Sequence, residues 1–292
     1  MPTRPVGAHQ RGFTLVELLV VITLLAGLAT IAVRSLATVQ DRAHFEATQR
    51  LLADCRAAIV GGGPVEGGFL ADLGRLPQVV PGNPLTELVS KQDSVPASQL
   101  VTDAVDPEIT LAVGWRGPYL DLPPGTDPNA ALFDEFGNPL EVVVDTGRWL
   151  LRSLGADGMV GGTGFDQDVT LALIDVPSGI RRTRTELGGT VTLETDPGFG
   201  TDLRVTVFVY EPDPASGGLR ARSTNATAVD PSTFPATFTY AFLGADATTP
   251  GRRVLRAYVH VVGETERPGD RRSLPISRLL PPGATTVDLV IP

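Results

Sequence analysis

The chain has 292 residues, a formal net charge of −9 at pH 7 and an apolar fraction of 42%, which is ordinary for a folded protein. This length allows an N-terminal helix and about two compact domains, and the many glycines and prolines favour turn-rich β structure over a helix bundle. The acidic balance, without a sustained basic stripe, argues against a nucleic-acid partner. Cys55 is the single cysteine, which excludes an intrachain disulfide, so we expect it to be a small packing residue.

An apolar run over residues 13–33 is the first predicted element. Its length of about twenty residues is enough to cross the hydrocarbon core of a bilayer as a helix. Glu17 interrupts the run, and a carboxylate in lipid is costly and usually kept for a specific partner. Arg4 and Arg11 precede the run with no acid beside them, which favours a cytoplasmic N-terminus.

Three interpretations compete for this run. A secretory signal peptide has a similar basic flank, but its apolar region is shorter and ends in a small-residue cleavage site. Here the small residue, Gly12, precedes the run, so cleavage there would leave the helix on the mature protein. A plain signal anchor accounts for the hydropathy alone. The Gly12–Phe13 junction with Glu17 behind it favours the third interpretation.

The sequence RGFTLVELLVVITLL resembles the class III signal of type IV pilins and pseudopilins. The resemblance implies that a prepilin peptidase cleaves after Gly12 and that the new terminus, Phe13, is N-methylated. It also implies that Glu17 pairs with the Phe13 amine of a neighbouring subunit during filament assembly. Such a pair would neutralise two charges that otherwise lie in an apolar environment.

The helical pattern continues beyond residue 33 and becomes amphipathic. Residues 13–59 contain no proline, so we predict one long helix, ended by the glycine and proline residues at 61–64. Its first half would lie in a membrane or filament core, and its second half would pack on a globular head. Residues 67–107 give weak signals, with a short helix or turn predicted at 68–73, a short helix at 85–90 and irregular loop elsewhere.

The next block predicts a β-hairpin. Residues 141–144 and 148–153 form two strand-like runs, joined by a tight turn at 145–147. A glycine-rich loop follows at once and contains Asp157, Asp166 and Asp168. Hard divalent cations take six to eight oxygen ligands, so such a loop is a candidate calcium site, although a solvated turn is the commoner structure for this composition. The spacing does not match an EF-hand, and no His or Cys favours zinc or copper.

The motifs GWRGPYL, DEFGNPL and SLGADGMVGGTGFDQDV follow the signal in the order found in the major pseudopilin of type II secretion systems. The resemblance covers about residues 11–170, with gaps in the weak segment. It implies that Ca²⁺ is bound by the side chains of Asp157, Asp166 and Asp168 and by backbone carbonyls near Ser153 and Leu154. Phe136, Glu135 and Leu140 depart from the tryptophan, proline and tyrosine of that family, which puts the local packing in doubt more than the ion.

The resemblance ends soon after the loop, but the chain continues. We predict strands at 189–194, 203–210, 219–223, 236–243, 254–262, 273–279 and 285–291. Turn-forming clusters separate these runs, and residues 203–210 alternate with Leu203, Val205, Val207 and Val209 on one face. This spacing predicts a β-sandwich of immunoglobulin-like or transthyretin-like type. A sandwich fold does not by itself identify a ligand.

Nothing in the sequence indicates catalysis. His9, His44 and His260 lie far apart in the chain, no serine or cysteine has a nucleophile signature, and no P-loop or dinucleotide fingerprint occurs. We therefore expect no enzyme activity.

The predicted fold class is α+β: a long pilin-type helix, a small antiparallel-sheet head and a C-terminal β-sandwich. The predicted parts are a leader (1–12), an assembly helix (13–60), a head (61–176) and the sandwich (177–292). We expect a single-pass inner-membrane precursor, with its C-terminal domains in the periplasm or outside the cell. The subunit would self-associate into a type II secretion pseudopilus, with a prepilin peptidase, minor pseudopilins and inner-membrane secretion components as partners. The alternative is a pilin-like display protein whose sandwich binds a carbohydrate or a protein.

Overall fold

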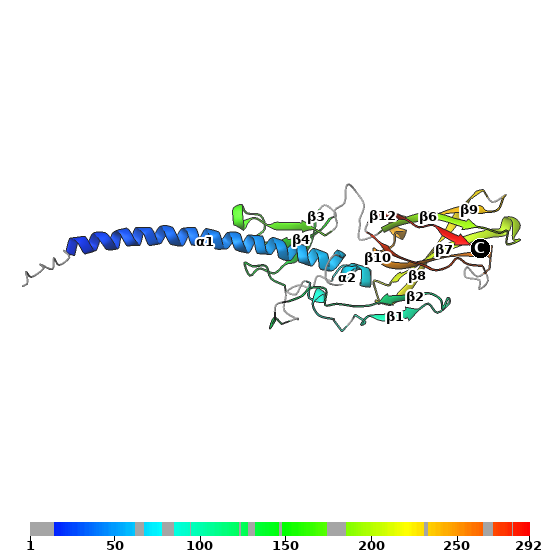
Figure 1. The fold of residues 1–292 in the computed structure, drawn as a ribbon, viewed down its shortest axis with the longest axis horizontal. Coiled ribbons are helices and arrows are strands. Elements are labelled where there is room, and N and C mark those ends of the chain that lie inside the picture. The colour runs from blue at the N-terminus through cyan, green and yellow to red at the C-terminus, as the bar shows by residue number, and fades with distance from the viewer. Residues whose placement is uncertain are drawn as a thin grey trace, which may run out of the picture.

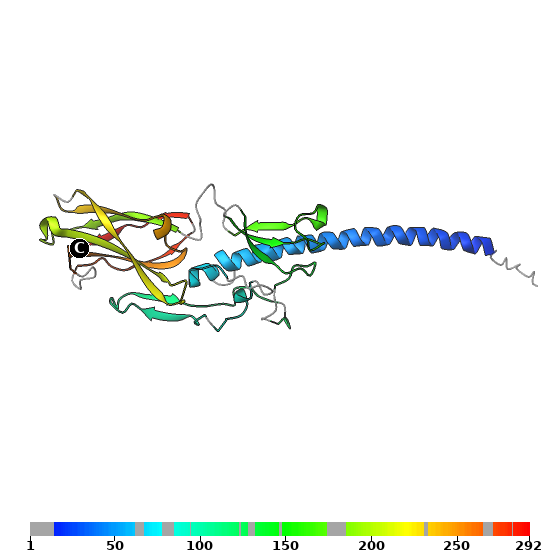
Figure 2. The same ribbon diagram turned by 180° about the vertical axis from the view of Figure 1, so that it is seen from behind.

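The computed structural model describes residues 15–61, 67–77, 85–93, 95–122, 124–127, 132–145, 148–173, 185–230, 233–264, 271–281 and 283–292. The predicted leader, with the Gly12–Phe13 junction, lies outside these residues. A long helix forms one end of an elongated molecule and a β-rich body forms the other (Figures 1 and 2). The class is α+β, as predicted, with an N-terminal helix and a large β-rich part.

Helix α1 (Leu15–Val60) is 46 residues long, which confirms one continuous helix over most of the predicted range. It ends at Gly61, whose positive φ of 106° suits glycine and whose N–H donates to the carbonyl of Ala57 at 2.9 Å. The first half is exposed, whereas the second half enters the body. Among the described residues, no helix is both long and apolar enough to span a membrane.

The head surrounds the second half of α1. It contains the antiparallel sheet β3 (Glu141–Asp145), β4 (Arg148–Ser153) and β5 (Val169–Ala172), in the order β3-β4-β5, which confirms the predicted hairpin. Two short helices, α2 (Gly68–Leu73) and η1 (Thr86–Leu88), lie at the two places predicted for them. Apolar side chains of α1, α2, η1 and this sheet share one core.

The C-terminal residues form one curled eight-stranded sheet. Its strands are β6 (Thr185–Leu193), β7 (Leu203–Pro212), β8 (Leu219–Asp230), β9 (Ala236–Phe242), β10 (Gly251–Val261), β11 (Ile276–Leu280), β12 (Gly283–Thr286) and β13 (Leu289–Ile291). The order is β11-β10-β7-β8-β9-β6-β12, and β13 also pairs with β6. Each predicted strand run coincides with one or two of these strands. Short 3-10 helices occupy Gly200–Asp202 and Gly244–Asp246 between these strands, and another occupies Gly164–Asp166 in the head.

The long strand β8 makes the sheet curl. Its first part pairs with β7 and its last part with β9, so the two ends of one strand belong to opposite sides of the core. β10 contacts β13 from the other side, so the sheet is nearly closed. The predicted inward face of β7 is confirmed, because Val205, Val207 and Val209 are all buried in this core. The immunoglobulin-like or transthyretin-like type of sandwich stays a prediction.

The irregular loop predicted for residues 67–107 is wrong over its last part. β1 (Gln99–Thr102) lies in that part and forms an antiparallel hairpin with β2 (Thr110–Val113), which follows the segment. Ile109, Leu111 and Val113 cover the outer face of β7 and β10, so Phe208, Tyr210, Val254 and Tyr258 on that face are buried too. The alternation at 109, 111 and 113 carried this signal, but the short strands are stable only against the distant sheet.

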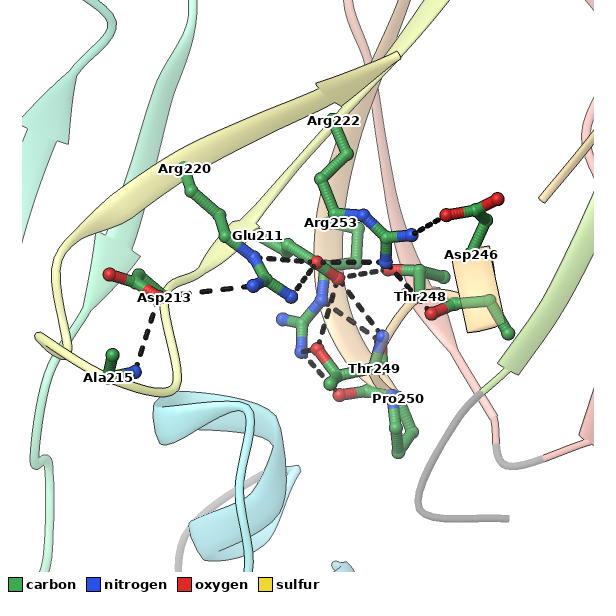
Figure 3. A network of polar contacts seen from close by, with 11 residues as sticks. Glu211, Asp213, Ala215, Arg220, Arg222, Asp246, Thr248, Thr249, Pro250 and Arg253 are labelled. Carbon is green, nitrogen blue, oxygen red and sulfur yellow. Dashed lines mark hydrogen bonds and ion pairs between the residues drawn. The ribbon is translucent and has the colours of Figure 1, made fainter. Parts of the chain in front are cut away.

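A buried carboxylate organises the base of the sheet. Glu211 is fully buried and accepts hydrogen bonds from the Thr248 hydroxyl, from the Thr249 N–H at 3.0 Å and from Arg220 Nε at 2.9 Å (Figure 3). Burial raises the pKa of Glu211, but the bonds from Thr248 and Thr249 and the charges of Arg220 and Arg253 outweigh it, so the pKa lies below its usual range. The carboxylate is therefore ionised and fully paired.

Two buried arginines join the sheet to the earlier part of the chain. Arg253 donates to the Ala71 carbonyl of α2 at 3.0 Å, and Arg256 donates to Asp106, in the β1–β2 loop, at 2.8 Å. Tyr258 donates a further hydrogen bond to Asp106. Both arginines are almost completely buried, so their hydrogen bonds define a dry polar contact between the two parts.

Candidate assembly site

The exposed half of α1 carries the sequence-predicted assembly residue. Glu17 lies in the first turn of the helix, where the helix dipole stabilises a negative charge. Exposed apolar side chains surround it and continue along the helix: Leu15, Val16, Leu18, Leu19, Val20, Val21, Ile22, Leu24, Leu25 and Leu28. Leu15 is 81% exposed. Soluble monomers rarely expose an apolar surface this large, so the surface indicates a site that a membrane or other protein chains cover.

The other half of α1 is covered by its own chain. Leu52, Cys55, Ala58 and Ile59 are buried in the head core, which confirms Cys55 as a packing residue. Burial, with a smaller contribution from the Asp54 charge, raises the pKa of the Cys55 thiol to about 12, so the thiol stays protonated. This half of the helix therefore anchors the body, and the first half protrudes from it.

The first of two turns that hold α1 where it enters the head is residues 133–139. The N–H of Glu135 donates to the Thr48 hydroxyl of α1 at 3.2 Å. The Phe136 and His44 rings lie 5.7 Å apart. The turn that carries the DEFGNPL motif is thus a direct contact to the helix.

The second turn, residues 154–166, closes the other side. Phe165 packs edge-on against Phe45 of α1, with the ring centroids 6.0 Å apart. Asn138 of the first turn donates to the Gly155 carbonyl at 2.6 Å, so the two turns are joined to each other. We call residues 133–139 and 154–166 together the collar. The collar lies at the end of the head that faces the protruding half of α1 (Figure 1).

Asp134 is a collar residue whose role could not be predicted from the sequence. Its buried carboxylate accepts hydrogen bonds from the Ser153 hydroxyl at 2.6 Å, from the Asn138 N–H at 2.7 Å and from the Phe136 N–H at 3.0 Å. It therefore fixes the first turn to the end of β4. The spacing Asp-x-x-Gly-Asn is a turn signal that could have predicted the turn, but not its bond to β4.

The structure places the three predicted calcium ligands in the second turn or directly after it, but not as a cluster. Asp157 accepts the N–H of Met159 at 2.9 Å, and Asp168 accepts the N–H of Gly161 at 3.1 Å. The guanidinium of Arg152 lies 3.8 Å from the other oxygen of Asp168. Among the described residues, no three His, Cys, Asp or Glu side chains are placed to hold a metal ion together.

The loop backbone folds tightly around Asp166 instead. Gly162 has a positive φ of 81°, and a Cβ there would lie 2.3 Å from the Asp166 carbonyl oxygen. Leu154 lies in this turn, and the hydroxyl of Ser153 is engaged with Asp134. As arranged, the three carboxylates do not converge on one point, which a calcium ion bound by all of them would require. Calcium binding stays a prediction.

Comparison with known proteins identifies the signal at the start of α1. A family model described as the prokaryotic N-terminal methylation motif matches residues 7–33. No curated protein and no solved structure matches the chain. The matched residues include Gly12, Phe13 and Glu17 and most of the exposed apolar surface of α1. The chain therefore carries the N-terminal signal of type IV pilin-like proteins, which a prepilin peptidase processes before pilus-type assembly.

Proposed function

We propose that this chain is a pseudopilin: a subunit that is cleaved after Gly12, methylated at Phe13 and assembled through α1 into the pseudopilus of a type II secretion system. The observation that supports it is the exposed apolar half of α1, which begins inside the matched methylation motif. In the precursor this half would lie in the inner membrane, with the body on the periplasmic side. In the filament, copies of the same half would cover one another.

Glu17 supplies the test. Glu17→Ala removes the carboxylate that would pair with the Phe13 amine of a neighbour, so incorporation into filaments should be lost while cleavage after Gly12 continues. The measurement is the filament fraction sheared from cells that make the full chain with its prepilin peptidase and assembly proteins. Glu46→Ala is the matched control, because Glu46 is an exposed acid on the same helix whose partner Arg42 is a surface residue. Normal assembly of the Glu17 variant contradicts the proposal.

The position of the β-rich part, beyond the end of α1, supports a specialised subunit that is present in few copies rather than an abundant one. The curled sheet continues the long axis of the molecule beyond the end of α1 (Figure 1). If α1 lies along a filament core, this part projects toward the position of the next subunit, and a dense array of such subunits would be crowded. Minor pseudopilins and inner-membrane secretion components are the partners that such a subunit would contact.

Calcium binding is a separate proposal that rests on the resemblance of the acidic loop. Binding would require Asp157, Asp166 and Asp168 to converge on a common ion, which they do not do in the described arrangement. The full-length chain in detergent should then melt at a higher temperature with calcium than with a chelator, and Asp157→Ala should remove the difference. If neither calcium nor the chelator changes the melting temperature, the proposal of calcium binding is wrong.

The second candidate is a pilin-like display protein. It is favoured by the β-rich part lying at the far end of the molecule from the apolar helix (Figure 2). An antibody fragment that binds this part would block adhesion of cells to a carbohydrate or protein surface without unfolding the chain. Loss of secretion with unchanged adhesion would instead support the pseudopilus.

A further inference from the structure

The collar exposes an apolar pair at the end of the head nearest the protruding helix. Met159 is 67% exposed and Val160 is 71% exposed, and both lie at the tip of the second turn. Phe133, at the start of the first turn, is 50% exposed. None of the three belongs to a core cluster of the described residues. Packing within the described part of the chain therefore does not account for the presence of these three apolar side chains.

The turn is built to hold this pair outward. The Asp157 carboxylate accepts the N–H of Met159, and the Asp168 carboxylate accepts the N–H of Gly161, so the backbone is fixed on both sides of Val160. The residues that resemble calcium ligands thus serve the shape of the loop. An apolar tip on a fixed backbone loses little conformational entropy when it is covered.

The apolar surface of α1 reaches toward the collar. Leu36 and Val39 are both exposed by about two thirds of their surface, and they precede the first helix residues that the collar contacts, His44 and Phe45. A helix rises about 1.5 Å per residue, so Val39 lies only about one and a half turns before those contacts. The exposed apolar surface of the helix therefore ends close to the collar.

We propose that the collar is a second self-association surface, in which Met159, Val160 and Phe133 pack against the apolar half of α1 from a neighbouring copy of the chain. The inference rests on the proposed filament function. A copy whose α1 runs alongside this one meets the collar where the protruding helix ends. Met159 is suited to such a contact, because an unbranched thioether side chain adapts to an irregular helix surface.

The first test adds charge to the tip. In Met159→Asp/Val160→Asp, two carboxylates would be buried at an apolar contact, so the sheared filament fraction should fall by about tenfold or more. Leu100→Asp is the matched control, because Leu100 is equally exposed but lies on β1, away from the collar. The thermal melting of both variants should match the parent chain, since all three positions are exposed.

The second test detects the contact itself. Met159→Cys in one tagged copy and Leu19→Cys, Leu25→Cys or Leu28→Cys in a differently tagged copy should give a mixed cross-link with a short bismaleimide. Cys55 does not compete, because it is buried and its thiol stays protonated. A mixed product from at least one pair supports the collar contact.

The outcomes separate the two proposals. If the parent chain forms no filaments, the proposed function and the collar contact both fail. If the parent assembles and the charged tip assembles equally well, or if no collar–helix pair cross-links although a Leu25→Cys pair between two helices does, only the collar contact is overturned.

Discussion

The two halves of α1 are one continuous helix with opposite surroundings. From Leu15 to Leu28 the large apolar side chains are exposed, whereas Leu52, Cys55, Ala58 and Ile59 are buried by the head. Both halves contain many aliphatic residues, but Glu17 is the one charged residue at positions 15–33, whereas the second half also carries arginines and acids on its polar side. The halves also differ in what packs against them. Residues of the head cover the second half, whereas no described residue covers the first half. One helix thus serves folding with one end and assembly with the other.

The largest expected effect comes from charging the exposed half. Leu25→Asp should abolish filament incorporation, because a carboxylate would enter the apolar contact between helices. The same variant should leave the unfolding free energy of the full-length chain in detergent within about 0.5 kcal/mol of the parent, since Leu25 is exposed. Gln49→Asp, at an exposed position beyond the collar contacts, should change neither property. A large loss of stability in Leu25→Asp would contradict the conclusion that the first half of the helix serves assembly and not folding.

The body should respond in the opposite way. Glu211→Ala leaves Arg220, Arg222 and Arg253 without their shared buried carboxylate and should lower the unfolding free energy by about 4 kcal/mol. The comparison variant Glu46→Ala removes two exposed i,i+4 pairs, with Arg42 and Arg50, and should cost less than about 1 kcal/mol. Urea titration of the full-length chain measures both. Equal losses would mean that the buried network contributes no more than a surface pair.

A smaller loss is expected within the covered half of α1. Ile59 is fully buried in the head core, so Ile59→Ala should lower the unfolding free energy by about 3 kcal/mol through lost transfer energy and the cavity left behind. Filament incorporation per folded molecule should stay unchanged. Ala53→Gly, at an exposed position of the same helix, should cost only about 1 kcal/mol. An assembly defect in correctly folded Ile59→Ala would show that the two halves are not independent.

The smallest effect is a pH dependence of the body. Burial raises the pKa of Asp106, but the Tyr258 hydrogen bond and the Arg256 charge outweigh it, so this pKa is lowered; the hydrogen bond from Arg256, with its charge, also lowers the pKa of Glu108. A lowered pKa contributes stability that is present above the unfolded value of about 4 and is lost as the pH falls below it. The unfolding free energy should therefore decrease below about pH 4.

Asp106→Asn isolates this contribution. As the pH falls, the unfolding free energy of this variant should decrease less steeply than that of the parent. The two slopes should differ by up to about 1.4 kcal/mol per pH unit, because the variant takes up one proton fewer on unfolding. Urea titrations between about pH 3 and pH 7 measure both slopes. Asp72 acts with the opposite sign, because burial raises its pKa despite the hydrogen bonds from Arg116 and Tyr119, so its contribution is lost as the pH rises. Parallel curves for the parent and Asp106→Asn would exclude Asp106 as a source of the acid sensitivity.

The local elements could be predicted because their signals are local. The long helix follows from an uninterrupted run without proline, and the β3–β4 hairpin from two runs around a tight turn. The C-terminal strands also appear where their alternation places them. The methylation signal is a contiguous motif, and the family match at residues 7–33 confirms it.

The features that sequence reasoning missed depend on distant residues. The β1–β2 hairpin is stable because β7 and β10 cover it, and the curl of the sheet comes from one strand, β8, that pairs with different partners at its two ends. The contacts within the acidic loop also depend on the fold: Asp157 and Asp168 accept N–H groups of the loop, and calcium binding there stays a prediction. Composition specifies which atoms are present, whereas their partners depend on the folded backbone.

The β1–β2 hairpin also has a consequence for the order in which the chain folds. Asp106 and the arginine that binds it are 150 residues apart, and the apolar side chains of β2 pack against β7 and β10. A chain synthesised from its N-terminus therefore completes α1 and the head strands long before this hairpin can be buried. Until β10 has formed, Ile109, Leu111 and Val113 stay exposed to solvent or to a chaperone. The β1–β2 hairpin can therefore reach its native packing only after β10 has been synthesised, although the assembly signal lies near the start of the sequence.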